Sequence, residues 1–254
     1  MTSESLVADS ALNERTKSAS FYRPELDVLR FFAFFAVFFT HLPRPHIQAG
    51  DSVGSAIFKS ACALLQDCGV FGMGIFFLLS AYLITELLQR EKLQTGTIHL
   101  RAFYTRRILR IWPLYFTALF LGYLVSRSGP GEWIGIGRMA SFLLLAGNWY
   151  TARHGYATNP IAPLWSISLE EQFYVVWPTL AKLAGRKALI VFCYGVLGAG
   201  FGVIAYLREL GVNMQPGIWT NSFVQFPLFA IGALLAIYLK GRKPVLPAWS
   251  RLVL

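Results

Sequence analysis

Charged side chains are scarce in this chain. Asp, Glu, Lys and Arg make up 14% of its 254 residues, 55% are hydrophobic, and the mean hydropathy is +0.50. A soluble globular domain is about one quarter charged. The composition therefore excludes an ordinary soluble protein and predicts an all-α, polytopic transmembrane helical bundle in a lipid bilayer.

Residue types that hold metals or disulfides are also few. The three cysteines have no metal-type spacing, and Cys193 lies inside an apolar run, which indicates packing. Three histidines lie in expected loops without a second ligand at metal spacing: His46, His99 and His154. We expect no disulfide framework, no metal site and no permanently bound cofactor.

Residues 1–20 have no apolar core and contain acidic and basic side chains, so they are neither a signal peptide nor a membrane span. We expect a disordered cytoplasmic tail over 1–20 and one membrane domain over 21–254. Six apolar stretches of spanning or nearly spanning length follow: Leu26–Leu42, Gly69–Leu88, Ile111–Val125, Ile167–Leu183, Ala188–Leu207 and Phe223–Leu239. A seventh, Ile134–Trp149, is shorter and broken by glycine.

The net charge of +10 reports orientation in a membrane protein, so it does not indicate a nucleic-acid partner. If all seven stretches cross and the tail is cytoplasmic, the basic clusters at 182–187 and 240–243 fall outside, against the usual bias of Lys and Arg toward the cytoplasm. If Ile134–Trp149 does not cross, both clusters return inside. We therefore expect this stretch to be re-entrant or interfacial, anchored by Trp133, Trp149 and Tyr150.

Two glycine patterns favour close helix packing. Gly69–Gly74 resembles a phosphate loop in glycine content but lacks its lysine. The segment Gly198–Gly202 has the spacing of small residues at a helix contact.

Arg30 and His41 occupy one face of the first apolar stretch. Eleven residues at 100° each make three turns, so a helix would hold them in one stripe about 16 Å apart. Ionisable groups in a membrane helix are costly and often functional. The alternative is that Arg30 reaches one interface and His41 ends the span at the other.

Arg106, Arg107 and Arg110 lie within five residues in the loop expected before the third span. On a helix, Arg107 and Arg110 would be neighbours able to converge on one anion, and a guanidinium fork suits phosphate. The alternative is a cytoplasmic anchor that contacts lipid headgroups.

Glu170 and Glu171 stand at the expected start of a span. Ser168 and Glu171 have the spacing of a capping box, which gives Glu171 a structural role. Glu170 has none, and it could orient an imidazole that acts as a general base. The alternative for Glu170 is a solvated acid favoured by the helix dipole.

Four ordered segments resemble the acyltransferase 3 family of integral membrane O-acyltransferases, which includes O-acetyltransferases of bacterial surface polysaccharides. They are Tyr22–Arg30 with His41, Phe76–Ser80, Arg106–Pro113 and Leu164–Pro178. Two glycines of the family pattern are replaced, by Val28 and Ala81. The family usually continues for several more spans, so the resemblance implies a bundle incomplete at its C-terminus.

The resemblance implies transfer of an acyl group, often acetyl, from acyl-CoA to a hydroxyl of a sugar or lipid-linked sugar, in a bacterial inner or plasma membrane with the N-terminus cytoplasmic. Its required arginine and histidine fall on Arg30 and His41, the first glutamate after its Trp-Ser motif on Glu170, and its cytoplasmic arginines on Arg107 and Arg110. We expect His41 as general base assisted by Glu170, Arg30 on the donor or its carbonyl, and the donor phosphates on Arg106, Arg107 and Arg110. The alternatives are a transporter that uses the same His, Arg and Glu as a proton or anion relay, and a non-catalytic membrane scaffold.

Overall fold

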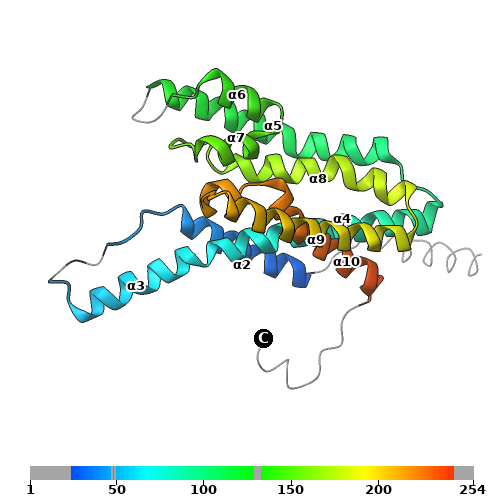
Figure 1. The fold of residues 1–254 in the computed structure, drawn as a ribbon, viewed down its shortest axis with the longest axis horizontal. Helices are drawn as coiled ribbons and strands as arrows, with labels where there is room; N and C mark the ends of the chain where they lie inside the picture. The colour runs from blue at the N-terminus through cyan, green and yellow to red at the C-terminus, as the bar shows by residue number, and fades with distance from the viewer. Residues whose placement is uncertain (1–23, 47, 49, 129–132, 243–254) are drawn as a thin grey trace, which may run out of the picture. The chain divides into compact units, whose positions relative to one another are not determined.

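The computed structural model describes residues 24–46, 48, 50–128 and 133–242 (Figure 1). The expected tail over 1–20 and Lys243 lie outside these residues. All the regular elements described are helices, which confirms the predicted all-α class. The chain divides into two compact units, residues 1–73 and 74–254.

The first unit contains helix α2 (Pro24–Thr40), helix α3 (Val53–Asp67) and the start of helix α4 (Gly69–Thr95). The start of α4 packs on α2 through small residues. A Cβ atom at Gly72 would lie 2.7 Å from the Ala33 carbonyl oxygen, and Ala33 is 1% exposed. This close approach confirms the packing role predicted for the glycines that begin α4.

Helix α3 is an element that the sequence interpretation missed, because no apolar stretch was expected between Leu42 and Gly69. Ser52 caps the helix by accepting a hydrogen bond from the backbone N–H of Ser55. Apolar side chains such as Ile57, Phe58 and Leu64 lie on its surface. Ser52 followed by an apolar run was the signal that could have revealed this helix.

In the second unit, helix α5 (Leu100–Ser128) lies beside helix α8 (Leu164–Leu183) in the opposite direction (Figure 1). Near the start of α5, the Tyr104 hydroxyl donates to the carbonyl oxygen of Val175 in the second half of α8, at 2.7 Å. Further along α5, the Tyr115 hydroxyl lies 3.2 Å from Ser168 near the start of α8. These pairs fix the antiparallel register.

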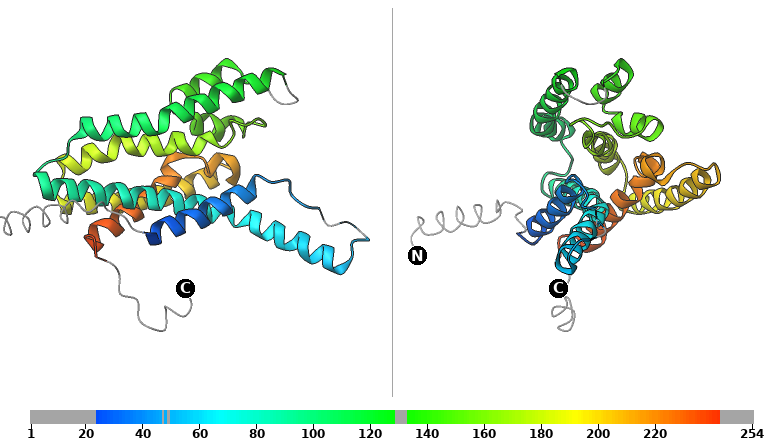
Figure 2. Two further views of the ribbon diagram at one scale, coloured as in Figure 1. Left: turned by 180° about the vertical axis from the view of Figure 1, so that it is seen from behind. Right: turned by 90° about the vertical axis from the view of Figure 1, so that its left-hand side faces the viewer.

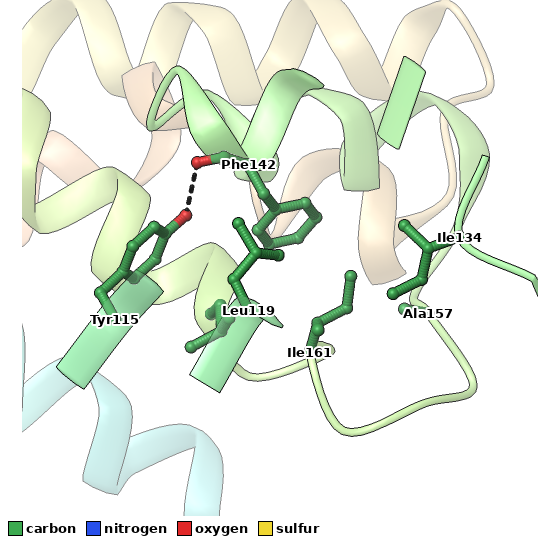
Figure 3. Packing of buried hydrophobic residues seen from close by; sticks show 7 residues of the cluster. Tyr115, Leu119, Ile134, Phe142, Ala157 and Ile161 are labelled. Atoms are coloured by element: carbon green, nitrogen blue, oxygen red, sulfur yellow. Dashed lines mark hydrogen bonds between the residues drawn. The ribbon is translucent and has the colours of Figure 1, made fainter. Parts of the chain in front are cut away.

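Two short helices join α5 to α8. Helices α6 (Ile136–Leu143) and α7 (Gly147–His154) have eight residues each, about 12 Å of helix against a hydrocarbon core of about 30 Å. A buried apolar cluster around Phe142, Ile161 and Leu119 packs α6 onto α5, and the Tyr115 hydroxyl donates to the Phe142 carbonyl oxygen at 2.8 Å (Figure 3). The chain therefore returns to the end of the bundle that it left, as expected for a segment that does not cross.

Helix α9 (Arg186–Glu209), a kinked turn over Met214–Ile218 and helix α10 (Ser222–Leu239) complete the second unit (Figure 2). Gly200 packs against Pro227 of α10, whereas Gly198 and Gly202 have no neighbour within 4 Å of a built Cβ. Only the central glycine of the predicted contact pattern is therefore used within the described residues. The Phe77 and Phe173 rings flank the Phe229 ring, with centroid distances of 4.9 and 4.7 Å. This aromatic contact joins α4, α8 and α10.

Four described segments are long and apolar enough to cross a membrane: Val53–Thr95, Leu100–Ser128, Arg186–Glu209 and Ser222–Leu239. The first joins α3 to α4. The expected spans Leu26–Leu42 and Ile167–Leu183 also fall on helices, α2 and α8, but neither is among these four. Helix α2 has 17 residues, and α8 carries two carboxylates near its start.

Candidate active site

Arg107 is the member of the arginine cluster that faces helix α8. The cluster lies in the first three turns of α5 rather than in a loop, because this helix begins at Leu100. The Arg107 guanidinium carbon lies 4.8 Å from the centroid of the Tyr174 ring and 5.8 Å from that of Phe103. Arg106 and Arg110 are exposed. The aromatic contacts hold one guanidinium in place and leave two for other partners.

Tyr174 links this arginine to Glu170. Its hydroxyl donates to Glu170 Oε2 at 2.7 Å, one helical turn earlier on α8. Ser80 of α4 also hydrogen-bonds to the Tyr174 hydroxyl. Residues from three of the four resemblance segments, Ser80, Arg107 and Glu170, therefore meet around one buried tyrosine ring.

Glu171 is the buried carboxylate of the pair, with 4% of its surface exposed. Its Oε2 accepts a hydrogen bond from the Trp112 indole N–H at 3.1 Å, and the charge of Arg107 attracts it. Its Oε1 is buried and accepts no hydrogen bond from the described residues. A buried carboxylate is costly unless it is paired, so the Trp112 N–H and the Arg107 charge offset part of the cost of burying Glu171.

The predicted capping box of Ser168 and Glu171 is wrong. Helix α8 begins at Leu164 after Pro163, whose fixed φ of −67° suits a helix start. Ser168 therefore lies inside the helix, where its hydroxyl donates to the Leu164 carbonyl oxygen at 3.3 Å. Glu171 turns sideways to α5 instead of back along its own helix. Trp112 and Tyr174 are the site residues that sequence reasoning missed, although both stand in the quoted segments.

Arg30 and His41 belong to the first unit, and their expected relation to Glu170 in the second unit stays a prediction. Arg30 pairs with Asp27 at 3.5 Å, with 42% of the arginine side chain exposed. Helix α2 ends at Thr40, so His41 is the first residue beyond it. The His41 backbone N–H donates to the Phe38 carbonyl oxygen at 3.1 Å. The predicted stripe therefore holds for Arg30, Phe34 and Val37 but ends one residue short of His41.

A buried polar network holds α8 at Gln172, the residue that follows Glu171. The Asn148 side-chain amide donates to the Thr220 carbonyl oxygen at 3.0 Å and to the Ser222 hydroxyl at 2.8 Å. Gln172 joins them by donating to Asn148 Oδ1 at 2.8 Å and accepting from Ser222 at 2.6 Å. These bonds tie α7, α8 and the start of α10 together, which fixes the position of the α8 carboxylates.

Tyr156, between α7 and α8, contacts the segment between α9 and α10. Its hydroxyl donates to Gln215 Oε1 at 3.2 Å, and burial raises the pKa of Tyr156 to about 12, so the hydroxyl is a hydrogen-bond donor throughout the physiological pH range. Within the described part of the chain, no group of three or more His, Cys, Asp or Glu residues could hold a metal ion.

The fold and this cluster define a helical membrane protein with an arginine and two carboxylates at the contact of two antiparallel helices. The acyltransferase domain family, acyltransferase 3, matches residues 23–254. The chain belongs to this family of membrane O-acyltransferases, which confirms the predicted resemblance.

Two relatives are similar to this chain over 65% and 96% of its length. An uncharacterized protein of Haemophilus influenzae is 32% identical over 186 residues, 65% of this chain and 74% of its own length. The peptidoglycan O-acetyltransferase OatA of Listeria monocytogenes is 27% identical over 261 residues, 96% of this chain but 38% of its own length. The chain thus spans little more than a third of that longer relative. No solved structure matches the chain.

Proposed function

We propose that the chain forms the membrane domain of an O-acyltransferase that moves an acyl group, typically acetyl, from acyl-CoA to a hydroxyl of a sugar or lipid-linked sugar. Membership of the family supports the reaction class. The observation that carries the proposal is the meeting of Ser80, Arg107 and Glu170 around Tyr174. Such a cluster places a fixed cation and a carboxylate inside an apolar bundle, where electrostatic interactions are strong.

The donor would bind through its phosphates to Arg106, Arg107 and Arg110. Coenzyme A carries several phosphate charges, and arginine binds phosphate with two parallel N–H donors. Arg107 is held by the Tyr174 ring, so it loses less freedom on binding. The exposed Arg106 and Arg110 are able to adapt to the ligand.

His41 would act as general base and Glu170 would orient it. The imidazole takes the proton of the acceptor hydroxyl, and the oxygen attacks the thioester carbonyl carbon. The new C–O bond forms as the C–S bond breaks, and the departing thiolate takes up a proton to give free coenzyme A. Arg30 would bind the donor or polarise the thioester carbonyl. In this proposal the tail and the arginines face the cytoplasm of a bacterial cell, and the acceptor binds at the outer side.

Acetyl-CoA binding tests the donor assignment. Membranes containing the protein are incubated with radiolabelled acetyl-CoA, and we expect Arg107→Gln to bind at least about tenfold more weakly, which corresponds to the loss of one charge-assisted contact. Arg127→Gln is the matched control, because Arg127 lies near the other end of the same helix with its guanidinium 5.3 Å from the Trp133 ring. Equal binding by the two variants would refute the donor site. Binding without any ester product would favour the transporter.

A further inference from the structure

A groove in the second unit lies apart from the Tyr174 cluster, where four helix termini meet. It is lined by the end of α4, the end of α8, the start of α9 and the end of α10. Its volume of about 530 Å³ falls in the range of small-molecule sites. The antiparallel register of α5 and α8 places this groove at the end of the unit that holds the start of α5.

The charges of the groove favour an anion. Four of its lining residues are basic and one is acidic: Arg90, Lys92, Arg186, Lys240 and Glu86. Glu86 is 2% exposed and accepts a hydrogen bond from Arg90 Nε at 2.8 Å. This pair leaves a surplus of three positive charges around a concave surface, which attracts anionic ligands more strongly than a flat one.

Two of the basic side chains are held at the rim by backbone carbonyl groups. Lys92 Nζ donates to the carbonyl oxygens of Ala181 and Lys182, each at 3.2 Å, and Arg186 donates to that of Ile237 at 3.4 Å. These bonds use two of three ammonium donors and one of five guanidinium donors. The charges are therefore positioned in advance, with donors left for a ligand.

The walls of the groove are apolar, formed by Leu88, Ile98, Leu189 and Ile237, and the exposed Leu93 lies at the rim. At its base Thr85 is 1% exposed, and its hydroxyl makes no hydrogen bond to the described residues. Gly241 allows the end of α10 to approach the Glu86–Arg90 pair. It has φ of +77°, and a Cβ there would lie 3.0 Å from Glu86 Oε1. The groove thus joins a cationic rim to an apolar interior.

We propose that this groove binds an anionic phospholipid, with the phosphate at Arg186 and Lys240 and the upper part of an acyl chain along the apolar walls. Basic residues at helix ends commonly make only diffuse headgroup contacts. Here they border a hollow between membrane helices, and basic pockets between such helices bind anionic headgroups. The proposal is independent of the acyl-transfer reaction and adds a site for a bilayer component.

Native mass spectrometry of the detergent-purified protein tests the site with phosphatidylglycerol and phosphatidylcholine of identical acyl chains. We expect at least tenfold preference for phosphatidylglycerol, lost in the double variant Arg186→Gln, Lys240→Gln. The double variant Arg153→Gln, Arg208→Gln removes the same charge from exposed positions outside the groove and should change binding less than twofold. Equal loss in both double variants, or no preference in the wild type, would overturn the proposal.

A second variant guards against misfolding. Leu93 lines the groove yet is 87% exposed, so Leu93→Glu adds a negative charge at the rim without disturbing the core. We expect it to weaken phosphatidylglycerol binding at least threefold, and unchanged binding would contradict the site. Glycerol phosphate and coenzyme A serve as competitors at equal concentration. Displacement by coenzyme A would assign the groove to a nucleotide, whereas displacement by neither supports the lipid.

Discussion

Helices α2 and α8 both carry ionisable residues in apolar segments, but they hold them in different ways. In α8, Glu170 and Glu171 accept hydrogen bonds from Tyr174 and Trp112, and Glu171 is buried. In α2, Arg30 pairs only weakly with Asp27, and His41 is exposed beyond the helix end. Ala33 is the only residue of α2 that is buried.

The difference separates residues that build the site from residues that are free to react. Removing a carboxylate of α8 leaves buried donors without acceptors, which lowers stability. An exposed ion pair such as Arg30 with Asp27 contributes at most about 1 kcal/mol. Substitutions in α2 should therefore change activity with little change in folding, whereas substitutions in α8 should change both.

The largest effect is expected for His41→Ala. Removal of a general base lowers acyl transfer by about 10²–10⁴-fold, while the exposed position predicts an unchanged thermal unfolding temperature. Ester formation from acetyl-CoA in membranes is the measurement. His46→Ala is the matched control, because His46 is exposed in the following loop and should retain full activity. Near-wild-type turnover of the His41 variant would remove the base assignment.

Replacement of the two α8 carboxylates should distinguish them by stability. Glu171→Ala leaves the Trp112 N–H unpaired and removes the negative partner of Arg107, so we expect a loss of about 1–3 kcal/mol. Glu170→Gln retains an acceptor for the Tyr174 hydroxyl and should cost less than about 1 kcal/mol. Denaturation in detergent provides the comparison. A larger loss for Glu170→Gln would reverse the assigned roles.

Helix contacts in the second unit should depend on single glycines. In Gly232→Ala, the added Cβ would overlap the Leu78 carbonyl group and lie 3.1 Å from the Ala81 Cβ, so we expect a loss of about 1–3 kcal/mol from overpacking. Gly202→Ala on α9 has open space around it and should be neutral or slightly stabilising. If the two variants have equal unfolding free energies, the tight contact between α4 and α10 is wrong.

Tyr174→Phe should weaken the cluster by a smaller amount. The ring that faces Arg107 remains, but the variant removes the hydroxyl that donates to Glu170 on the same helix at 2.7 Å and bonds to Ser80 of α4, which costs about 1 kcal/mol. We expect a severalfold fall in acyl transfer with acetyl-CoA binding retained. Tyr104→Phe, which removes a hydroxyl from a bond to a backbone carbonyl outside the cluster, is the control. Loss of donor binding in Tyr174→Phe would contradict the separation of these roles.

The smallest effect concerns pH in the first unit. The Gln48 backbone N–H and the Lys59 ammonium, both at 2.8 Å, lower the pKa of Asp51 below its ordinary value of 3.8. The folded form therefore binds its proton less readily than the unfolded form. The stabilisation by Asp51 is present above pH 3.8 and disappears as pH falls through the lowered pKa. The wild type and Asp51→Asn should differ in unfolding temperature at pH 6 and converge below pH 3.8.

Most helices were predictable because the length of an apolar stretch and the spacing of its glycines can be read directly from the sequence. The return of the chain through α6 and α7 followed from the basic clusters, since a seventh crossing would have placed them against the charge bias. The partner of Glu171 was not predictable, because Trp112 lies on α5 and only the packing of α5 against α8 brings the two side chains together. Helix α3 was missed because its apolar run lies between polar turns and is short for a span.

The eight-residue helices α6 and α7 determine the direction of everything that follows them in the chain. In the proposed topology, an insertion that lengthened this connection enough to cross the bilayer would reverse α8, α9 and α10 and move their basic ends to the opposite face of the membrane. The length of the sequence between Ser128 and Leu164 therefore decides the orientation of the helices that follow it. Only insertions and deletions that keep this connection from crossing the bilayer would be tolerated.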